Sequence, residues 1–237
     1  MLEAIILAGG LGTRLRSTVP DLPKPMAPIS GRPFLEHQMD FWIQQGVTRF
    51  VLSVGFMREK IMAHFQHQYR GVEIVYAEEV EPLGTGGGLV LAYQKLIGDQ
   101  PILVMNGDTF FEVDLKAFQK FHHEKQASVT LALFQVQQND RYMGVQISGD
   151  GYIQKFKAEQ GVSQLANGGV YLMNRDVLKS MPWPAGAKLS LEDDLFQHVQ
   201  KAGQQIGGML FEGRFIDIGV PFDYQRAATV LAGRSTQ

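Results

Sequence analysis

A glycine-rich stretch near the start of the chain ends with one cation and is followed by another. The stretch ILAGGLGTRL contains Arg14, and the next segment, LPKPM, contains Lys24 between Pro23 and Pro25. Backbone N–H groups of consecutive small residues can turn toward an anion, arginine presents a fork of donors to phosphate, and lysine adds a point charge. This combination predicts a binding site for a polyphosphate. The alternative is a surface turn whose cations are solvated.

The glycine stretch differs from the two best-known glycine motifs of nucleotide sites. The dinucleotide fingerprint is G-x-G-x-x-G, but Leu15 stands where the third glycine would be. A Walker loop ends in Gly-Lys-Ser/Thr, and that ending does not occur in this stretch. We therefore expect phosphate chemistry of another kind.

Two aspartates follow or lie within strand-like segments later in the chain. Asp108 comes after the apolar run Ile102–Met105, and Asp217 lies between Ile216 and Ile218. Mg²⁺ is a hard cation that typically takes one or two carboxylates together with phosphate oxygens. The pair therefore predicts a Mg²⁺ site beside the polyphosphate. The alternatives are a turn or helix-cap aspartate at 108 and a paired buried acid at 217.

A second glycine-rich segment, EEVEPLGTGGG (78–88), follows the third predicted strand. Glycines allow backbone groups to come close to the edge of a flat base. Guanine presents N1–H and N2–H₂ donors, which the carboxylates of Glu79 and Glu81 are candidates to accept. A solvated acidic loop is the alternative.

Strand-like and helix-like segments alternate through the first half of the chain and must position these side chains. Four short apolar runs are typical of buried parallel strands: Ala4–Ala8, Phe50–Val54, Val72–Ala77 and Ile102–Met105. Apolar residues at helical spacing predict helices at Phe34–Gln45, Glu59–Gln68, Gly88–Leu96 and Leu115–Glu124.

The second half is richer in strands. We expect strands at Ala127–Val136, Val145–Ser148, Tyr152–Phe156 and Gly169–Met173, and helices at Leu191–Lys201 and Phe222–Leu231. The pattern predicts a single α/β domain, residues 1–237, on a doubly wound, mixed and mainly parallel sheet with an inserted β-rich part. Such sheets bind ligands beyond the carboxyl ends of their strands, which is where the first glycine stretch and Asp108 fall.

Composition narrows the class of protein. The chain has 237 residues, 45% hydrophobic and 19% charged, a formal net charge of −2 and no cysteine. It can bury a sizeable core, and it has no disulfide or thiolate metal site. Because basic residues do not cluster, we expect no nucleic-acid partner. We find no run of the roughly 18 apolar residues that span a membrane and no signal peptide, so we expect no membrane partner and a cytoplasmic location.

Five segments together resemble the signature of the sugar-1-phosphate nucleotidyltransferases. They are LAGGLGTRL…PKPM, EPLGTGG (81–87), NGDTFF (106–111), NGGVYL (167–172) and FIDIGVPFDY (215–224). PKPMAPISGRPFLE, NGDTFFEVDL and FIDIGVPFDY are most similar to the D-glycero-D-manno-heptose 1-phosphate guanylyltransferases of that family. The resemblance implies a Rossmann-like nucleotidyltransferase fold. In it, residues 1–126 would mainly bind the nucleotide, and residues 127–237 would mainly bind the sugar and close the site.

The resemblance also implies roles for single residues. Asp108 and Asp217 would be the Mg²⁺ ligands, Arg14 would contact the leaving pyrophosphate and Lys24 the α-phosphate, so these four would be the catalytic residues. The expected nucleotide contacts are Leu7, Ala8, Gly9, Gly10, Gly12, Thr13, Arg14, Glu79, Glu81, Gly84, Thr85 and Gly86.

Sugar contacts are expected from the second half and from one residue beside Asp108. They are Asn106, Tyr142, Gly144, Lys157, Asn167, Gly168 and Glu192, and a structural role is the alternative for each.

One segment departs from the family. The family commonly carries F-x-E-K before the asparagine, with the glutamate on sugar hydroxyls and the lysine on the sugar phosphate. This chain has Ala158 and Glu159 at those positions, and Lys157 would substitute with a local shift in register.

The resemblance implies a Mg²⁺-dependent enzyme. It would transfer a guanylyl group from GTP to D-glycero-D-manno-heptose 1-phosphate, giving GDP-heptose and pyrophosphate. Mannose 1-phosphate, another sugar or another base is the alternative within the class. A non-catalytic regulatory subunit that binds a nucleotide-sugar is the alternative from a different class, and a homo-oligomer is left open.

Overall fold

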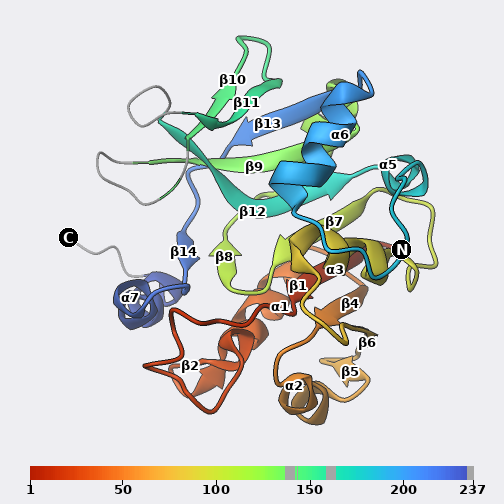
Figure 1. Ribbon diagram of the computed structural model, residues 1–237. Coiled ribbons are helices and arrows are strands. Elements are labelled where there is room, and N and C mark those ends of the chain that lie inside the picture. The colour runs from red at the N-terminus through yellow and green to blue at the C-terminus, as the bar shows by residue number, and fades with distance from the viewer. Residues whose placement is uncertain (137–141, 143, 159–163, 234–237) are drawn as a thin grey trace.

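The computed structural model describes residues 1–136, 142, 144–158 and 164–233 (Figure 1). Its strands are β1 (Glu3–Ala8), β2 (Pro28–Ile29), β3 (Arg32–Pro33), β4 (Arg49–Val54), β5 (Gln68–Tyr69), β6 (Val72–Glu78), β7 (Ile102–Asn106), β8 (Thr109–Phe111), β9 (Val129–Gln135), β10 (Gly144–Ile147), β11 (Ile153–Ala158), β12 (Leu165–Met173), β13 (Ile206–Leu210) and β14 (Phe215–Asp217). Its helices are η1 (Lys24–Met26), α1 (Phe34–Gln44), α2 (Arg58–Phe65), α3 (Gly84–Tyr93), α4 (Leu115–Glu124), α5 (Arg175–Lys179), the π-helical turn η2 (Leu191–Leu195), α6 (Phe196–Lys201) and α7 (Pro221–Leu231).

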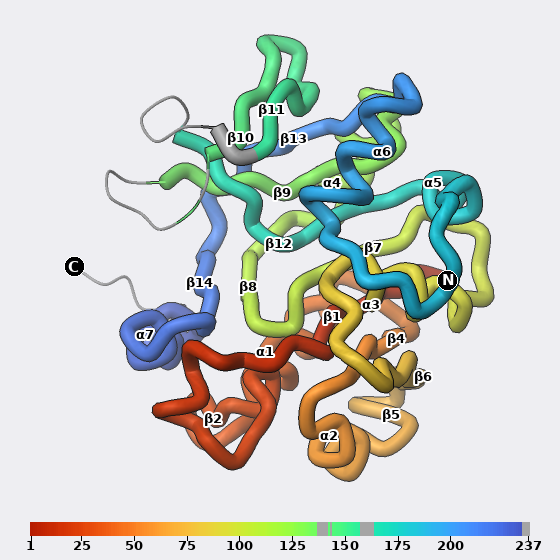
Figure 2. The backbone as a smooth tube through the Cα atoms, in the orientation of Figure 1, coloured from red at the N-terminus to blue at the C-terminus, as the bar shows by residue number. Residues whose placement is uncertain are grey.

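One mixed sheet forms the centre of the described structure. Its strand order is β11-β10-β12-β7-β1-β4-β6-β5, with β9 paired to β12 and β13 paired to β9. The pairs β7–β1, β1–β4 and β4–β6 are parallel, whereas β12 runs antiparallel to both β7 and β9. The N-terminal half therefore builds the parallel part and the second half adds the β-rich part, as Figure 2 shows from red to blue. This confirms the predicted fold class.

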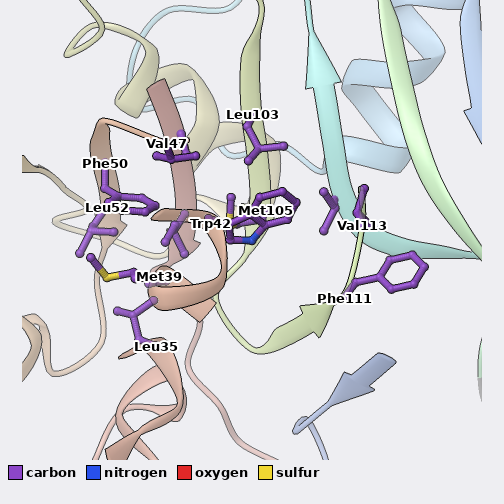
Figure 3. Packing of buried hydrophobic residues seen from close by; sticks show 14 of the residues in the cluster. Leu35, Met39, Trp42, Val47, Phe50, Leu52, Leu103, Met105, Phe111 and Val113 are labelled. Atoms are coloured by element: carbon purple, nitrogen blue, oxygen red, sulfur yellow. The ribbon is translucent and has the colours of Figure 1, made fainter. Parts of the chain in front are cut away.

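Helices cover both faces of the sheet because alternate strand residues point to opposite sides. On one face, Leu35, Met39 and Trp42 of α1 pack in the same cluster as Leu52 and Met105 of the sheet (Figure 3). On the other face, α3, α5, η2 and α6 pack in a second buried cluster, which contains the sheet residues Ile5, Val51, Val104 and Leu131. The loops at the ends of these strands thus start from a sheet that is buried on both faces.

A two-stranded ribbon of β8 and β14 lies outside the central sheet. The strands are antiparallel, with Asp217 opposite Thr109. After β14 the chain enters α7, which returns to the N-terminal half near β2 (Figures 1 and 2), where the Tyr224 hydroxyl donates to the carbonyl oxygen of Pro28 at 2.8 Å. A third buried cluster joins Leu15, Phe110 and Ile216 at this contact. The last helix therefore closes the chain against the segment that carries the first glycine stretch.

One predicted helix is placed differently. The sequence predicts a helix at Gly88–Leu96, but α3 begins at Gly84 and ends at Tyr93, so residues 84–88 of the glycine-rich segment are helical. Tertiary contacts explain the earlier start. The N–H groups of Gly86 and Gly87 donate to the carbonyl oxygen of Leu189 at 2.9 and 3.2 Å, so the first turn bonds to a distant segment.

Candidate active site

A cleft of about 560 Å³ opens at the carboxyl ends of β1 and β7. This is the edge at which an open parallel sheet binds its ligands. Its lining residues are Leu7, Ala8, Gly9, Gly10, Leu11, Gly12, Thr13, Arg14, Lys24, Pro25, Glu79, Pro82, Gly84, Thr85, Asn106, Gly107, Asp108 and Lys188. The predicted nucleotide residues therefore lie round one cavity, except Glu81 and Gly86.

The first glycine stretch leaves β1 and bends along this cleft. Gly12 adopts φ +60°, which favours glycine, and its Cα faces the Lys24 side chain. Gly9 is required for packing, because a Cβ there would lie 2.0 Å from Oε1 of Glu79. The glycines thus shape the wall of the cleft and bring Lys24 to it.

Lys24 and Asp108 meet across the cleft. Nζ of Lys24 donates to Oδ2 of Asp108 at 2.8 Å, and their side chains are 11% and 32% exposed. Pro23 and Pro25 flank Lys24 at the start of η1, where they restrict the backbone. The lysine therefore enters the site from a rigid turn, and Asp108 keeps a solvent-accessible part.

The β8–β14 ribbon brings the two predicted metal ligands together. The N–H of Ile218 donates to the carbonyl oxygen of Asp108 at 3.0 Å, and Asp217 is the register partner of Thr109. The N–H of Gly219 donates to Oδ1 of Asp217 at 2.6 Å. Residues 108 and 217, far apart in the sequence, are thus neighbours across one ribbon.

The side chain of Arg14 lies near the turn at Gly219, which follows β14. A Cβ at Gly219 would come within 3.5 Å of Nη2 of Arg14 and within 2.6 Å of Oδ1 of Asp217. Glycine at 219 therefore allows the guanidinium and the Asp217 carboxylate to approach the backbone from the same side. All four predicted catalytic residues surround one region between the two halves of the chain.

The two acidic candidates for base recognition differ in position. Glu79 is 6% exposed and lines the cleft, and its carboxylate accepts from Oγ of Ser53 at 2.9 Å and from the N–H of Leu83 at 3.1 Å. Glu81 is exposed and does not line the cleft. The N–H of Gly86 is taken by Leu189, so it is not available to a base, whereas Gly84 and Thr85 line the cleft.

A second cavity, of about 260 Å³, lies beside the first and shares Asn106 with it. Its lining residues are Asn106, Thr109, Tyr142, Val145, Phe156, Asn167, Gly168, Gly169, Glu192, Phe215 and Asp217. Five of the predicted sugar residues are among them. Gly144 is buried in β10 and is absent from this lining, and the side chain of Lys157 and all of Glu159 lie outside the part of the chain that the structure describes.

A hydrogen-bond network fixes the polar wall of the second cavity. Nδ2 of Asn167 donates to the Tyr171 hydroxyl at 2.9 Å and to Oε1 of Glu192 at 3.1 Å. Burial raises the pKa of Tyr171 well above its ordinary value, and the charge of Glu192 raises it further, so the phenol stays neutral. Gly168 serves packing as well, because a Cβ there would lie 2.4 Å from the Phe111 ring.

Lys188 is a cleft residue that the sequence did not indicate. It is exposed and lines the larger cleft, and within the described residues it has no hydrogen bond or ion pair. Its neighbour Leu189 bonds to the start of α3, with Leu189 N–H donating to Leu83 O at 2.8 Å. The segment AKLSLEDD has no local phosphate motif. The position of Lys188 at the cleft therefore becomes visible only from the tertiary contact between this segment and α3.

The donor set fits a hard divalent cation. Asp108 lines the larger cleft and Asp217 the smaller cavity beside it, and magnesium sites typically combine one or two carboxylates with substrate phosphates. Among the described residues no group of three or more His, Cys, Asp or Glu side chains forms a protein-only metal cage. Mg²⁺ sites of this kind complete their coordination with water and substrate phosphate oxygens.

The chain belongs to the nucleotidyl transferase family, whose sequence model matches residues 3–233. This confirms the family that the motifs predicted. A D-glycero-alpha-D-manno-heptose 1-phosphate guanylyltransferase of Aneurinibacillus thermoaerophilus is 40% identical over 232 residues, which cover 97% of this chain and 98% of the relative.

Solved structures and more distant relatives extend this similarity. The crystal structure of HddC from Yersinia pseudotuberculosis matches with a TM-score of 0.83 and 31% identity, covering 96% of this chain and 98% of that one. Another crystal structure of HddC is a complex with GMP-PN. The mannose-1-phosphate guanylyltransferase catalytic subunit beta of Danio rerio is 32% identical, and the match covers 94% of this chain but 62% of that protein.

No helix among the described residues is long and apolar enough to span a membrane.

Proposed function

We propose that this protein is a guanylyltransferase that makes GDP-heptose and pyrophosphate from GTP and D-glycero-D-manno-heptose 1-phosphate. The observation that carries the proposal is the pair of adjoining cavities, which share Asn106; Asp108 lines the larger one and Asp217 the smaller one. A triphosphate in the larger cavity and a sugar phosphate in the smaller one would meet beside the charged residues. The near full-length similarity to heptose 1-phosphate guanylyltransferases supports this choice of substrates.

The reaction is an in-line exchange at the α-phosphorus of GTP. An oxygen of the sugar 1-phosphate forms a bond to that phosphorus, the bond to the β-phosphate oxygen breaks, and pyrophosphate leaves with the electron pair. The attacking oxygen is already an anion, so no general base is needed. The protein's task is to align two anionic substrates and offset their repulsion.

The four charged residues fit this task. Lys24 would contact the α-phosphate, which receives the attack, and Arg14 would grip the leaving pyrophosphate with its forked donors. Asp108 and Asp217 would hold Mg²⁺ with phosphate oxygens, and the bound ion would neutralise charge that builds up on the phosphates. Lys188, on the α3 side of the cleft, would add a further cation for the nucleotide.

Glu79 and the start of α3 would recognise the base. Both Glu79 oxygens have a protein donor, but a carboxylate has about four acceptor positions, so it can still accept from guanine N1–H or N2–H₂. Gly84 and Thr85 would pack along the base, with Leu7 to Gly9 as the facing backbone.

The second cavity would bind the sugar through Asn167, Glu192, Tyr142 and Asn106. The division into a nucleotide part (1–126) and a sugar part (127–237) remains a proposal. It is supported by the two linings, although Lys188 from the second part joins the first cavity, and Asn106 and Thr109 from the first part line the second. The cytoplasmic location and a homo-oligomer stay predictions.

The alternatives are less well supported. Mannose-1-phosphate guanylyltransferases are less similar, and this chain spans less than two thirds of their length. A non-catalytic regulatory subunit would not need Arg14, Lys24, Asp108 and Asp217, yet all four surround one site.

A pyrophosphate-release screen tests the proposal. GTP, ATP, UTP and dTTP are each combined with heptose, mannose and glucose 1-phosphates in the presence of Mg²⁺. We expect GTP with the heptose phosphate to give the highest kcat/KM. A higher kcat/KM for GTP with mannose 1-phosphate would show that mannose 1-phosphate, not the heptose phosphate, is the preferred substrate. Activity with UTP or dTTP but not with GTP would overturn the guanylyl assignment.

A further inference from the structure

The turn that carries Asp108 is bonded to a buried glutamine of α1. Gln38 is 1% exposed, and its Nε2 donates to the carbonyl oxygen of Asn106 at 2.8 Å and to that of Thr109 at 2.7 Å. These two carbonyls lie on either side of Gly107 and Asp108. Because carbonyl oxygens only accept, the donor end of the amide must face them, and the orientation of Gln38 is settled.

Two further backbone groups of this turn are bonded to different elements. The N–H of Gly107 donates to the carbonyl oxygen of Leu7 in β1 at 2.9 Å, and the carbonyl oxygen of Asp108 accepts from Ile218 beyond β14 at 3.0 Å. Together with Gln38, four consecutive residues of the turn are thus tied to β1, α1 and the segment after β14. The backbone of Asp108 has a defined position relative to Asp217.

Gln38 is an unusual residue for its position on α1. The other buried residues of this helix are the apolar Phe34, Leu35, Met39 and Trp42. Oε1 of Gln38 is buried without a hydrogen-bond partner among the described residues. An orphaned buried acceptor costs free energy that an apolar side chain would avoid, so packing alone does not account for an amide here.

We propose that Gln38 is a positioning residue for Asp108: its amide clamps the β7–β8 turn so that the Asp108 carboxylate is held ready for a divalent cation and the substrate phosphates. This inference rests on the role of Asp108 in the proposed function. Removing an outer partner that orients a metal ligand typically lowers metal affinity or activity by about 10- to 100-fold.

The test compares Gln38→Met with Gln44→Met. Methionine keeps the volume and apolar packing at position 38 but removes both donors. Gln44 is an exposed residue of the same helix, which makes it the matched control. Urea unfolding shows whether each variant is folded, and GTP binding is then measured by calorimetry without sugar phosphate, in EDTA and in Mn²⁺.

We expect Mn²⁺ to strengthen GTP binding to the wild type and to the Gln44→Met variant. In folded Gln38→Met the affinity in EDTA stays at the wild-type value, while the strengthening by Mn²⁺ and the kcat each fall about 10-fold or more. A merely structural residue would weaken GTP binding in both buffers alike, and that result would overturn the proposal. So would full strengthening by Mn²⁺ in Gln38→Met.

Asp108→Asn separates this inference from the proposed function. If Asp108→Asn loses the Mn²⁺ effect but Gln38→Met keeps it, the positioning role fails and the metal assignment stands. If Asp108→Asn keeps the Mn²⁺ effect, the metal assignment fails and the role of Gln38 fails with it. The sugar screen does not enter either result, because the Mn²⁺ effect on GTP binding is measured without sugar phosphate.

Discussion

Lys24 and Asp108 form an ion pair through the 2.8 Å contact between Nζ and Oδ2. In the proposed reaction they act on different partners, the lysine on a phosphate and the aspartate on a cation. Substrate binding would therefore exchange this ion pair for two new ones. Because Asp108 is 32% exposed, the pair itself adds little to the stability of the fold.

Removing the Asp108 charge should separate catalysis from folding. We expect Asp108→Asn to lower the rate of pyrophosphate release by about 100-fold or more, because the site loses an electrostatic contact in the transition state. The free energy of unfolding, measured with urea, should change by less than about 1 kcal/mol. Asp99→Asn, at an exposed loop position, is the matched control. A folded Asp108→Asn variant with near wild-type pyrophosphate release would remove Asp108 from the catalytic set.

At the scale of elements, the segment after α5 is docked closely on the start of α3. A Cβ at Gly87 would lie 2.2 Å from the carbonyl oxygen of Ala187, and a Cβ at Gly84 would lie 2.5 Å from that of Leu189. The N–H of Leu191 also donates to Oγ1 of Thr85 at 3.0 Å. The glycines of this motif therefore permit a backbone contact that places Lys188 at the larger cleft.

We expect Lys188→Gln to raise the KM for GTP about 10-fold with little change in kcat. A hydrogen bond to a charged group is worth about 1.5–3 kcal/mol, and about 1.4 kcal/mol corresponds to a tenfold change in affinity. Steady-state kinetics at saturating sugar phosphate measure this. Lys201→Gln, at an exposed end of α6, should leave KM unchanged. An unchanged KM in Lys188→Gln would exclude the lysine from GTP binding.

At the scale of the whole molecule, a buried ion-pair network joins distant parts of the chain at the opposite ends of the strands. Glu3 of β1 accepts from Nη1 of Arg49 at 2.6 Å and from Arg175 of α5, and the N–H groups of Ile97 and Gly98 also donate to it. Burial by itself raises the pKa of Glu3, but these donors outweigh it, and the pKa lies below its ordinary value.

The lowered pKa of Glu3 predicts a pH-dependent contribution to stability. The unfolded chain binds the proton more readily, so the stabilisation is complete well above the ordinary value of 4.5 and disappears as the pH falls through the lowered folded-state value. We expect Glu3→Gln to cost about 3 kcal/mol at pH 7, because it removes the charged partner of Arg175 and one of the two carboxylates paired with Arg49, and less at pH 4. Urea unfolding at both pH values measures the difference. An equal cost at pH 7 and pH 4 would contradict the linkage.

Much of the fold was predictable because its signals are local. The apolar runs of β1, β4, β6 and β7 and the periodicity of α1 and α4 each reflect burial of one segment against a common core. The start of α3 was not predictable, because three of the first four residues of GTGGG are glycine, and the helix begins there through bonds to Leu189, far along the chain.

The same division applies to the candidate site. The sequence by itself determined the family and indicated the loop with Arg14 and Lys24 and the two aspartates as its candidate site, because these residue types stand in short, recognisable segments. Only the tertiary structure decided that Glu79 rather than Glu81 lines the cleft, that Lys188 joins it, and that Gln38 bonds to the Asp108 turn. The physical reason is that those three facts depend on contacts between segments far apart in the chain, and such contacts leave no pattern within a short stretch of sequence.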